Sequence, residues 1–352
     1  MKKIIFLIGL AIVFLILARS GVNGEVLFQD NFDSQANWTV LQPTGSTNFC
    51  YPGNCTPGNP PNNWSGYYNG ACLCDGISGE PGNNLLYINQ YAGYPNETNT
   101  CRGGSGKCWT YWQESCVNYF DNSDGMLFKD LGQEYQEVYI RIYMKFKSGW
   151  ERKVDHSSFK LFHVQHIIPG TNPYIYHDVE GGQNNRPLAA GGIREDAGYM
   201  YLYGDGLCYT NISCHGDILW SLGTITAAYQ AGGIFDGNWH SIEWRFKSNT
   251  VINTANGIVE VWFDGVKLNY FSGYIGNNIN FNDAGSSELR GFRYIGLGGN
   301  SESQWDTSCS NMADCEQWYA IDDVVISTTY IGSGLPVDNS PQAPRGFSIS
   351  QN

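Results

Sequence analysis

Charge and helical periodicity are both scarce in this sequence of 352 residues. Only 15% of the residues are charged, and the acidic residues outnumber the basic ones by 33 to 20, which gives a net charge of −13. Nucleic-acid-binding proteins rely on clustered Lys and Arg, so this balance argues against nucleic acid as a partner. Long amphipathic helical patterns are absent, whereas 43 Gly, 23 Tyr and 11 Trp are present. This composition predicts a loop-rich, all-β protein.

Several catalytic and metal-binding signatures are missing as well. The sequence has no serine-hydrolase or phosphate-loop signature, and the Gly cluster at 103–106 lacks the strand–helix context of a nucleotide site. Pairs of the form Cys-x2-Cys with a nearby His, which zinc sites use, do not occur. No short-period repeat is present, which argues against solenoids and propellers.

Long apolar runs are limited to the N-terminus. Met1-Lys2-Lys3 is followed by an uninterrupted apolar run over residues 4–18. A membrane-spanning helix needs ~20 residues, so this shorter run predicts a secretory signal peptide. We expect cleavage after Gly24, with cleavage after Ser20 or an uncleaved anchor as alternatives. Residues 1–24 are then the signal peptide, and the mature protein is expected to be secreted and free of the membrane.

The eleven cysteines agree with export, because disulfides persist in oxidising compartments. Two local Cys-x5-Cys pairs are predicted to close small loops: Cys208 with Cys214, and Cys309 with Cys315. The other seven cysteines lie within residues 42–120, which we interpret as a disulfide-rich loop insertion. Because the total is odd, at least one thiol is free or pairs between chains, and this leaves self-association open.

Strand patterns are clear from residue 135 onward. In EVYIRIYMKFK (137–147), Val138, Ile140 and Ile142 begin an apolar face that alternates with a polar one. Similar patterns occur at 158–167, 198–204, 240–247, 257–265, 290–299 and 318–328, with turn signals between them. Many strands and hardly a helix predict a two-sheet antiparallel β-sandwich over residues 25–331. Residues 332–352 are rich in Pro, Gly, Ser and Asn and are expected to be a linker or flexible tail.

The succession of VYIRIYMKF, KLFHV, GNWHSIEWRFK, NGIVEVWFDGVKL, FRYIGLGG and YAIDDVVISTTYIG resembles a known family. These segments are similar to the concanavalin A-like jelly rolls, and more closely to the branch with alginate and glucuronan lyases and laminin-G-like lectin domains. The resemblance covers residues 25–41 and 135–331. It implies a jelly roll whose concave sheet carries a polysaccharide groove, although the fold by itself does not give the activity.

The resemblance to alginate lyases also implies a set of site residues. β-Elimination needs a group that neutralises the uronate carboxylate, a base for the C5 proton and an acid for the leaving oxygen. We predict Arg141 with Gln165 as neutraliser, His163 as base, and Tyr294 or Tyr143 as acid. No cofactor is required for this chemistry. The predicted substrate-binding residues are Tyr139, Lys145, Lys160, Glu260 and Trp262.

This chain departs from the lyase pattern in two places. It reads His163-Val164-Gln165 where alginate lyases have Gln-x-His, and the Arg-x-Glu-x-Arg element is missing around Arg141. In a regular strand, His163 and Gln165 share a face with Phe159 and Leu161, while Lys160, Phe162, Val164 and His166 share the other. His163 and His166 are therefore expected to point in opposite directions, and only one of them can line a groove.

Four acidic residues near the ends of the domain raise the question of a metal. Asp30 and Asp33 lie in or near the first strand, and Asp322 and Asp323 lie in the last one. First and last strands are often neighbours in this architecture, and carboxylates suit Ca²⁺. A structural calcium ion is therefore predicted there, with solvent-facing strand ends as the alternative.

Two functions from different classes fit the sequence. The first is a polysaccharide lyase acting on an acidic glycan, with polysaccharide as the partner. The second is a non-catalytic carbohydrate-binding or adhesive protein, or a self-assembling extracellular structural protein. A glycosidase is disfavoured, because the Glu-x-Asp-x-x-Glu pattern of glucanases with this fold is absent.

Overall fold

The computed structural model describes the following parts of the chain: residues 24–42, 47–51, 54–56, 59–70, 84–92, 101–103, 106–113, 120–148, 159–166, 188–194, 199–203, 218–221, 234, 236–270, 279–282, 288–304 and 317–334. Nearly all of these residues that have regular structure lie in β-strands. Within this part of the chain, no helix is long and apolar enough to cross a membrane.

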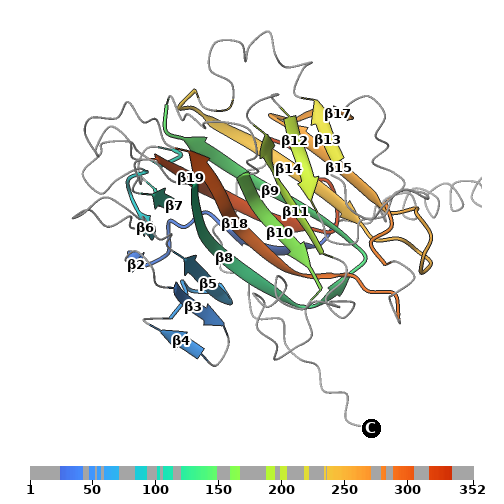
Figure 1. Ribbon diagram of the computed structural model, residues 1–352, viewed down its shortest axis with the longest axis horizontal. Coiled ribbons are helices and arrows are strands. Elements are labelled where there is room, and N and C mark those ends of the chain that lie inside the picture. Colours follow the sequence, from blue (N-terminus) through green and yellow to red (C-terminus); the bar gives the residue numbers. More distant parts are fainter. Residues whose placement is uncertain are drawn as a thin grey trace, which may run out of the picture.

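The strands form two sheets, and every pairing between them is antiparallel (Figure 1). Sheet A has nine strands in the order β16 (Val266–Lys267), β15 (Ile258–Phe263), β14 (Trp239–Lys247), β9 (Glu137–Phe146), β19 (Gln317–Ser327), β7 (Cys108–Gln113), β6 (Asn84–Asn89) and β2 (Trp38–Gln42), with β1 (Val26–Asp30) paired to β19. Sheet B has ten strands in the order β17 (Asn269–Tyr270), β13 (Ile218–Ser221), β12 (Tyr199–Tyr203), β11 (Leu188–Arg194), β10 (Phe159–Gln165), β18 (Phe292–Gln304), β8 (Phe120–Tyr135), β5 (Gly66–Gly70), β3 (Thr47–Tyr51) and β4 (Asn54–Thr56). The predicted antiparallel β-sandwich of the jelly-roll class is thus confirmed.

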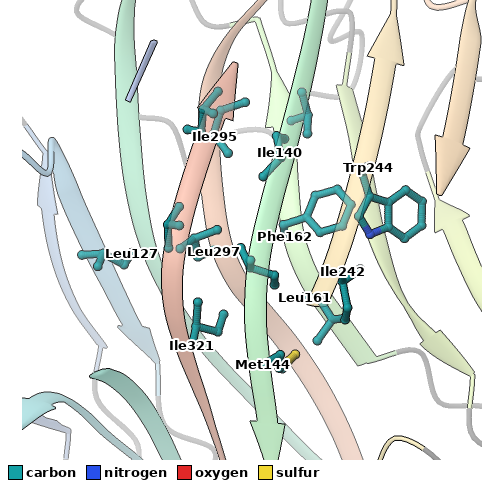
Figure 2. Close-up of a cluster of buried hydrophobic side chains, with 14 of the residues drawn as sticks. Leu127, Ile140, Met144, Leu161, Phe162, Ile242, Trp244, Ile295, Leu297 and Ile321 are labelled. Atoms are coloured by element: carbon teal, nitrogen blue, oxygen red, sulfur yellow. The ribbon is translucent and has the colours of Figure 1, made fainter. Parts of the chain in front are cut away.

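The hydrophobic core lies between the two sheets. In β15, Val259, Val261 and Phe263 are fully buried and alternate with partly exposed residues, as the sequence pattern predicts. Phe162 of sheet B meets Trp244 of sheet A edge to face, with 4.8 Å between the ring centroids (Figure 2). Each such aromatic pair contributes about 0.5–1.5 kcal/mol beyond the area that it buries.

The segment 42–120 contributes strands to both sheets. Its strands β6 and β7 extend sheet A between β19 and β2, and its strands β3 and β5 extend sheet B from β8. A disulfide joins Cys101 to Cys108. The sequence predicted a disulfide-rich loop insertion here, and the described parts of this segment are also built into the sandwich. The two predicted pairs, Cys208 with Cys214 and Cys309 with Cys315, lie outside the described residues.

Gly298 occupies a position in β18 that admits no side chain. Its φ is +93°, and a Cβ atom added there would lie 2.2 Å from the carbonyl oxygen of Gly125 and 2.9 Å from the hydroxyl of Tyr319. Tyr319 belongs to sheet A, so β18 approaches the opposite sheet closely at this point. A glycine is therefore required both by the backbone conformation and by the packing.

Gly298→Ala is expected to lower the free energy of unfolding by about 2–5 kcal/mol, the sum of left-handed strain and overpacking. Gly103→Ala is the matched control, because Gly103 has a φ of +81° and nothing within 4 Å of the added Cβ. The control is expected to cost only the strain, about 1 kcal/mol. Denaturant unfolding of both variants measures the difference, and equal losses would contradict the close approach.

Candidate functional site

The strand that carries His163 presents alternate residues to the core and to the outer face of sheet B. Phe162 and Val164 belong to the core, so His163 and Gln165 lie on the outer face. The predicted parity of these residues holds, but Leu161 joins the core with Phe162 because the strand register shifts between Lys160 and Phe162. His163 and Gln165 are themselves buried, with 1% and 5% of their surface exposed.

The neighbouring strand β18 supplies the next side chains of this face. Tyr294 lies opposite Gln165, and Gly296 lies opposite His163. A Cβ atom on Gly296 would come within 2.4 Å of the sulfur of Met126, so the glycine lets Met126 approach the His163 position. The next strand across is β8, where Asp130 lies opposite Tyr294. Asp130, Tyr294 and Gln165 therefore form one row across three adjacent strands.

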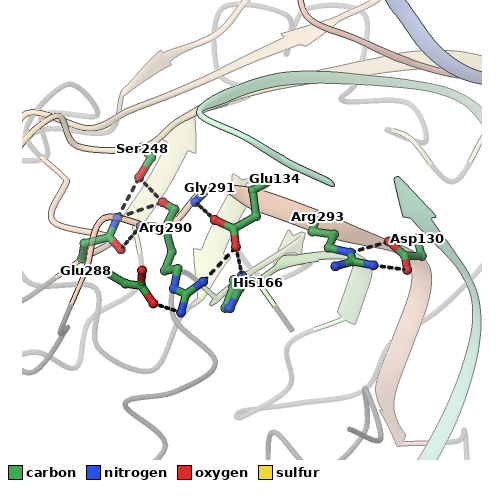
Figure 3. A network of polar contacts seen from close by, with 9 residues as sticks. Asp130, Glu134, His166, Ser248, Glu288, Arg290, Gly291 and Arg293 are labelled. Atoms are coloured by element: carbon green, nitrogen blue, oxygen red, sulfur yellow. Dashed lines mark hydrogen bonds and ion pairs between the residues drawn. The ribbon is translucent and has the colours of Figure 1, made fainter. Parts of the chain in front are cut away.

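Arg293 joins this row because of an irregularity in β18. The register between β18 and β8 shifts between Phe292 and Tyr294, so that Arg293 as well as Tyr294 reaches Asp130. Nε and Nη2 of Arg293 donate to the two carboxylate oxygens of Asp130 at 2.7 and 2.9 Å (Figure 3). We call the set of His163, Gln165, Tyr294, Asp130 and Arg293 the His163 face. Burial and the neighbouring Asp130 carboxylate raise the pKa of Tyr294 to about 12, so its hydroxyl stays protonated at neutral pH.

His166, one residue beyond β10, belongs to a separate network at the end of the sandwich. Its Nδ1 lies 2.8 Å from a carboxylate oxygen of Glu134, which also accepts from Arg290 and from the backbone N–H of Gly291 (Figure 3). Burial lowers the pKa of His166. This network joins the ends of β8, β10 and β18 next to the Asp130–Arg293 pair, and the Arg293 charge also lowers the pKa of His166.

Arg141 and Tyr143 lie in the other sheet. Both belong to β9 of sheet A, whose inner residues Ile140 and Ile142 are in the core, so their side chains are on the outer face of sheet A. The outer faces of the two sheets are on opposite sides of the core. The structure therefore does not bring Arg141 and Tyr143 together with His163, Gln165 and Tyr294, and the five predicted catalytic residues do not form one site.

Residues 330–333, which we call the C-terminal strap, cover the part of the outer face of sheet A that is formed by β9, β14 and β15. The Glu243 carboxylate accepts hydrogen bonds from the backbone N–H groups of Ile331 and Gly332, both at 2.8 Å. Arg141 donates to the carbonyl oxygen of Gly332 at 2.8 Å, and Tyr143 donates to that of Ser333. Arg141 has no exposed surface and Glu243 only 3%, and the polar side of β9 is buried at Tyr139, Arg141 and Tyr143.

The predicted substrate-binding residues that can be placed also lie on the outer face of sheet A. The Trp262 ring is 6.3 Å from Tyr139 and 4.9 Å from Tyr330 of the C-terminal strap. Glu260 is bound by Arg245 at 2.6 Å and by Lys267. Lys145 follows Tyr143 on the same face of β9, and burial lowers its pKa. Lys160 is in β10, and its side chain is outside the described part of the structure.

The four predicted metal ligands have other partners. Asp30 accepts hydrogen bonds from Phe32 N–H, Gln35 and Trp64 at 2.7–2.8 Å, and Asp33 accepts from Lys107 N–H. Asp323 pairs with Arg102, while burial and the adjacent Asp323 raise the pKa of Asp322 to about 9. In the described residues, no three or more His, Cys, Asp or Glu side chains are grouped to hold a metal ion. The four carboxylates are thus not assembled as a calcium site here, and calcium binding stays a prediction.

Asp130, Arg293 and Glu243 were not among the residues predicted for the site. Arg293 and Tyr294 are adjacent in FRYIGLGG, and alternation alone places adjacent residues on opposite faces. Only the register shift brings both to Asp130, and strand periodicity carries no signal for such a shift. Glu243 stands in WHSIEWRFK at a position that alternation identifies as outward-facing, but the strap that buries it comes from a segment 88 residues further along the chain.

Comparisons with known proteins add the following. No protein-family model and no curated protein matches the chain. Among solved structures, an endo-β-1,4-glucuronan lyase from the fungus Trichoderma reesei is similar at 12% identity, over 82% of this chain and 97% of that one, with a TM-score of 0.45. The cellulose-induced protein Cip1 is 12% identical over 71% of this chain and 88% of that one, with a TM-score of 0.38. A mutant of the alginate lyase Aly36B in complex with alginate trisaccharide is 12% identical over 63% of this chain and 85% of that one, with a TM-score of 0.38.

Removal of the C-terminal strap is expected to destabilise the sandwich. A chain that ends at Thr329 leaves buried Arg141 and Glu243 without their backbone partners, at a cost on the order of 3 kcal/mol. A chain that ends at Gly334 keeps the strap and is the matched control. Thermal and denaturant unfolding compare the two chains. Equal stability would show that the contacts of the strap contribute nothing to the fold.

His240 predicts a pH-dependent contribution to stability. Its Nδ1 lies 2.8 Å from Asp264 and its Nε2 lies 3.1 Å from Asp236. Burial alone would lower the pKa of His240, but the hydrogen bonds to Asp264 and Asp236 outweigh burial and raise the pKa above 6.5. Because the folded-state pKa is the higher one, the stabilisation is fully present below pH 6.5 and is lost as pH rises through the folded pKa. The free energy of unfolding of the wild type, measured as a function of pH, should show this loss, and that of His240→Gln should not. Equal pH profiles of the two proteins would contradict a contribution from His240.

Proposed function

We propose that this chain is an exported protein whose His163 face binds an acidic polysaccharide and cleaves it by β-elimination. The observation that carries the proposal is the position of a histidine, a glutamine and a protonated tyrosine on one face of adjacent strands. His163 and Gln165 come from β10, and Tyr294 comes from β18 directly opposite Gln165. Regular strands hold these side chains more rigidly than loops do, as acid–base catalysis requires.

Each of the three residues has one of the catalytic roles that the reaction needs. His163 takes the C5 proton of the uronate, and the electron pair of that C–H bond forms the C4–C5 double bond. The C4–O bond breaks, and Tyr294 donates its proton to the leaving oxygen. The Gln165 amide donates hydrogen bonds to the uronate carboxylate and so stabilises the charge that develops next to C5. Arg141 and Tyr143, on the other sheet, take no part.

A second candidate function is sugar binding without chemistry. The order His163-Val164-Gln165, where alginate lyases have Gln-x-His, favours it, because the base is then not at the position that the lyase pattern gives it. In that case the same histidine, glutamine and tyrosine form hydrogen bonds to a glycan as in a lectin. The two functions differ only in whether a bond is broken, so the appearance of the double bond separates them.

We expect the purified protein to produce the ultraviolet absorbance of the C4–C5 double bond on at least one polymer from a panel of uronate polysaccharides. His163→Ala is expected to abolish the signal. Two substitutions of the same chemical kind then test the location of the site: Tyr294→Phe should lower kcat by about 10²–10⁴-fold, the usual contribution of a general acid, and Tyr143→Phe should change it little.

Each variant is checked for folding by thermal unfolding before its activity is compared. No absorbance on any polymer, together with binding on a glycan array that His163→Ala weakens, would replace the lyase by the lectin-like function. Activity that survives both His163→Ala and Tyr294→Phe but is lost in Tyr143→Phe would move the site to sheet A.

A further inference from the structure

Asp130 is held in one orientation by donors from two residues. Arg293 binds both of its carboxylate oxygens, and the backbone N–H of Gly132 donates to Oδ1 at 2.8 Å. Tyr294 lies directly opposite Asp130 on the neighbouring strand, which places its phenol beside the same carboxylate. The backbone N–H of Asp130 is in turn bound by the Ser65 hydroxyl at 2.8 Å. This carboxylate is thus fixed at the point where β8 and β18 meet beside the His163 face.

The local backbone explains how one carboxylate reaches two adjacent side chains. Between the pairs Tyr294–Asp130 and Phe292–Tyr135, β8 has four residues, 131–134, where β18 has only Arg293, so β8 has three extra residues. This excursion includes Gly132 at a φ of +80°, which turns its N–H back to Asp130. Bulges of this kind redirect side chains and occur frequently next to active sites. Here the irregularity brings Arg293 and Tyr294 to the same carboxylate.

We propose that Asp130, held by Arg293, is a positioning residue for Tyr294: its carboxylate accepts a hydrogen bond from the phenol hydroxyl and so fixes that hydroxyl beside Gln165. In a reaction on the His163 face, the phenol proton passes from this hydrogen bond to the leaving oxygen, so Tyr294 acts as an acid and not as a base. The catalytic consequence rests on the proposed function, whereas the positioning itself does not.

The charges around Tyr294 support this direction. Burial alone would raise the pKa of Asp130, but the hydrogen bonds from Arg293 and Gly132 outweigh it and lower that pKa, so the carboxylate is ionised at neutral pH. A negative charge that accepts the hydrogen bond of a phenol disfavours the phenolate. Arg293 acts on the phenol in the opposite direction, but its charge is shared with Asp130. Burial and this carboxylate therefore both favour the protonated form of Tyr294.

The alternative is that Asp130 and Arg293 form only a structural ion pair that joins β8 to β18. Glu134 offers a matched comparison, because it is also a carboxylate of β8 that binds an arginine. Its partner is Arg290, two residues before β18, at 3.2 Å. Glu134 has no contact with Tyr294 among the interactions that the structure describes. A structural role would make the two carboxylates equivalent, whereas a positioning role affects only Tyr294 through Asp130.

The experiment is a titration of Tyr294 that does not depend on activity. Tyrosine labelled with ¹³C at the ζ carbon gives one resonance per residue, and Tyr294→Phe identifies the resonance of Tyr294. We expect Asp130→Asn to increase the acidity constant of Tyr294 at least about tenfold, which is one pKa unit. Glu134→Gln should leave it unchanged. In an active enzyme, Asp130→Asn should also move the alkaline limb of the kcat profile to lower pH.

A folded Asp130→Asn protein with an unchanged Tyr294 titration would overturn the positioning. If that variant does not fold, Tyr294→Phe tests the same hydrogen bond from the other side: loss of the hydroxyl should raise the pKa of Asp130, and an unchanged Asp130 titration would refute the contact. A shifted Tyr294 titration without elimination on any polysaccharide would support the positioning and reject the lyase. The two proposals can therefore fail separately.

Discussion

The core between the two sheets is the constraint on which the rest of this structure depends. Sheets in a sandwich lie about 10 Å apart, and their inward-facing side chains fill the space between them, as Phe162 and Trp244 do here. Polar side chains are then left with two outer faces that point in opposite directions. His163 is on one of them and Arg141 is on the other. No single substrate can contact both, however similar the two strands look in the sequence.

Local features of the sequence were sufficient to predict the fold class and much of the core. The alternation in 137–147 and 257–265 identifies the residues that point inward, because side-chain direction in a strand repeats every two residues. Periodicity does not say which sheet a strand joins. The consecutive strands β9 and β10 belong to different sheets, since β9 pairs with β14 and β19 while β10 pairs with β11 and β18. That division depends on contacts between distant segments. The prediction from the sequence therefore assigned residues from the outer faces of two different sheets to one site.

The other differences between the predicted and the observed site have two causes. One is irregular strand backbone, and the other is the burial of a strand face by a segment that is distant in the sequence. Leu161 changes sides at a shift in register, and Arg293 reaches Asp130 at another. The polar side of β9 was interpreted as a sugar groove because it carries tyrosines and cations, which is also the composition of a surface that binds backbone groups. Arg141 and Glu243 bind the carbonyl and N–H groups of the C-terminal strap. A buried ion of this kind requires polar partners, and only the three-dimensional structure shows that the C-terminal strap supplies them.

The C-terminal strap also determines on which side of the sandwich the described chain ends. Ser333 lies against the turn at Gly265, so Gly334, the last residue that the structure describes, is on the side of sheet A. This end of the described chain is therefore on the side opposite the His163 face. Any surface, particle or neighbouring domain attached through that end would sit behind sheet A. The molecule would then present Gln165 and Tyr294 away from its tether, toward whatever lies in front of it.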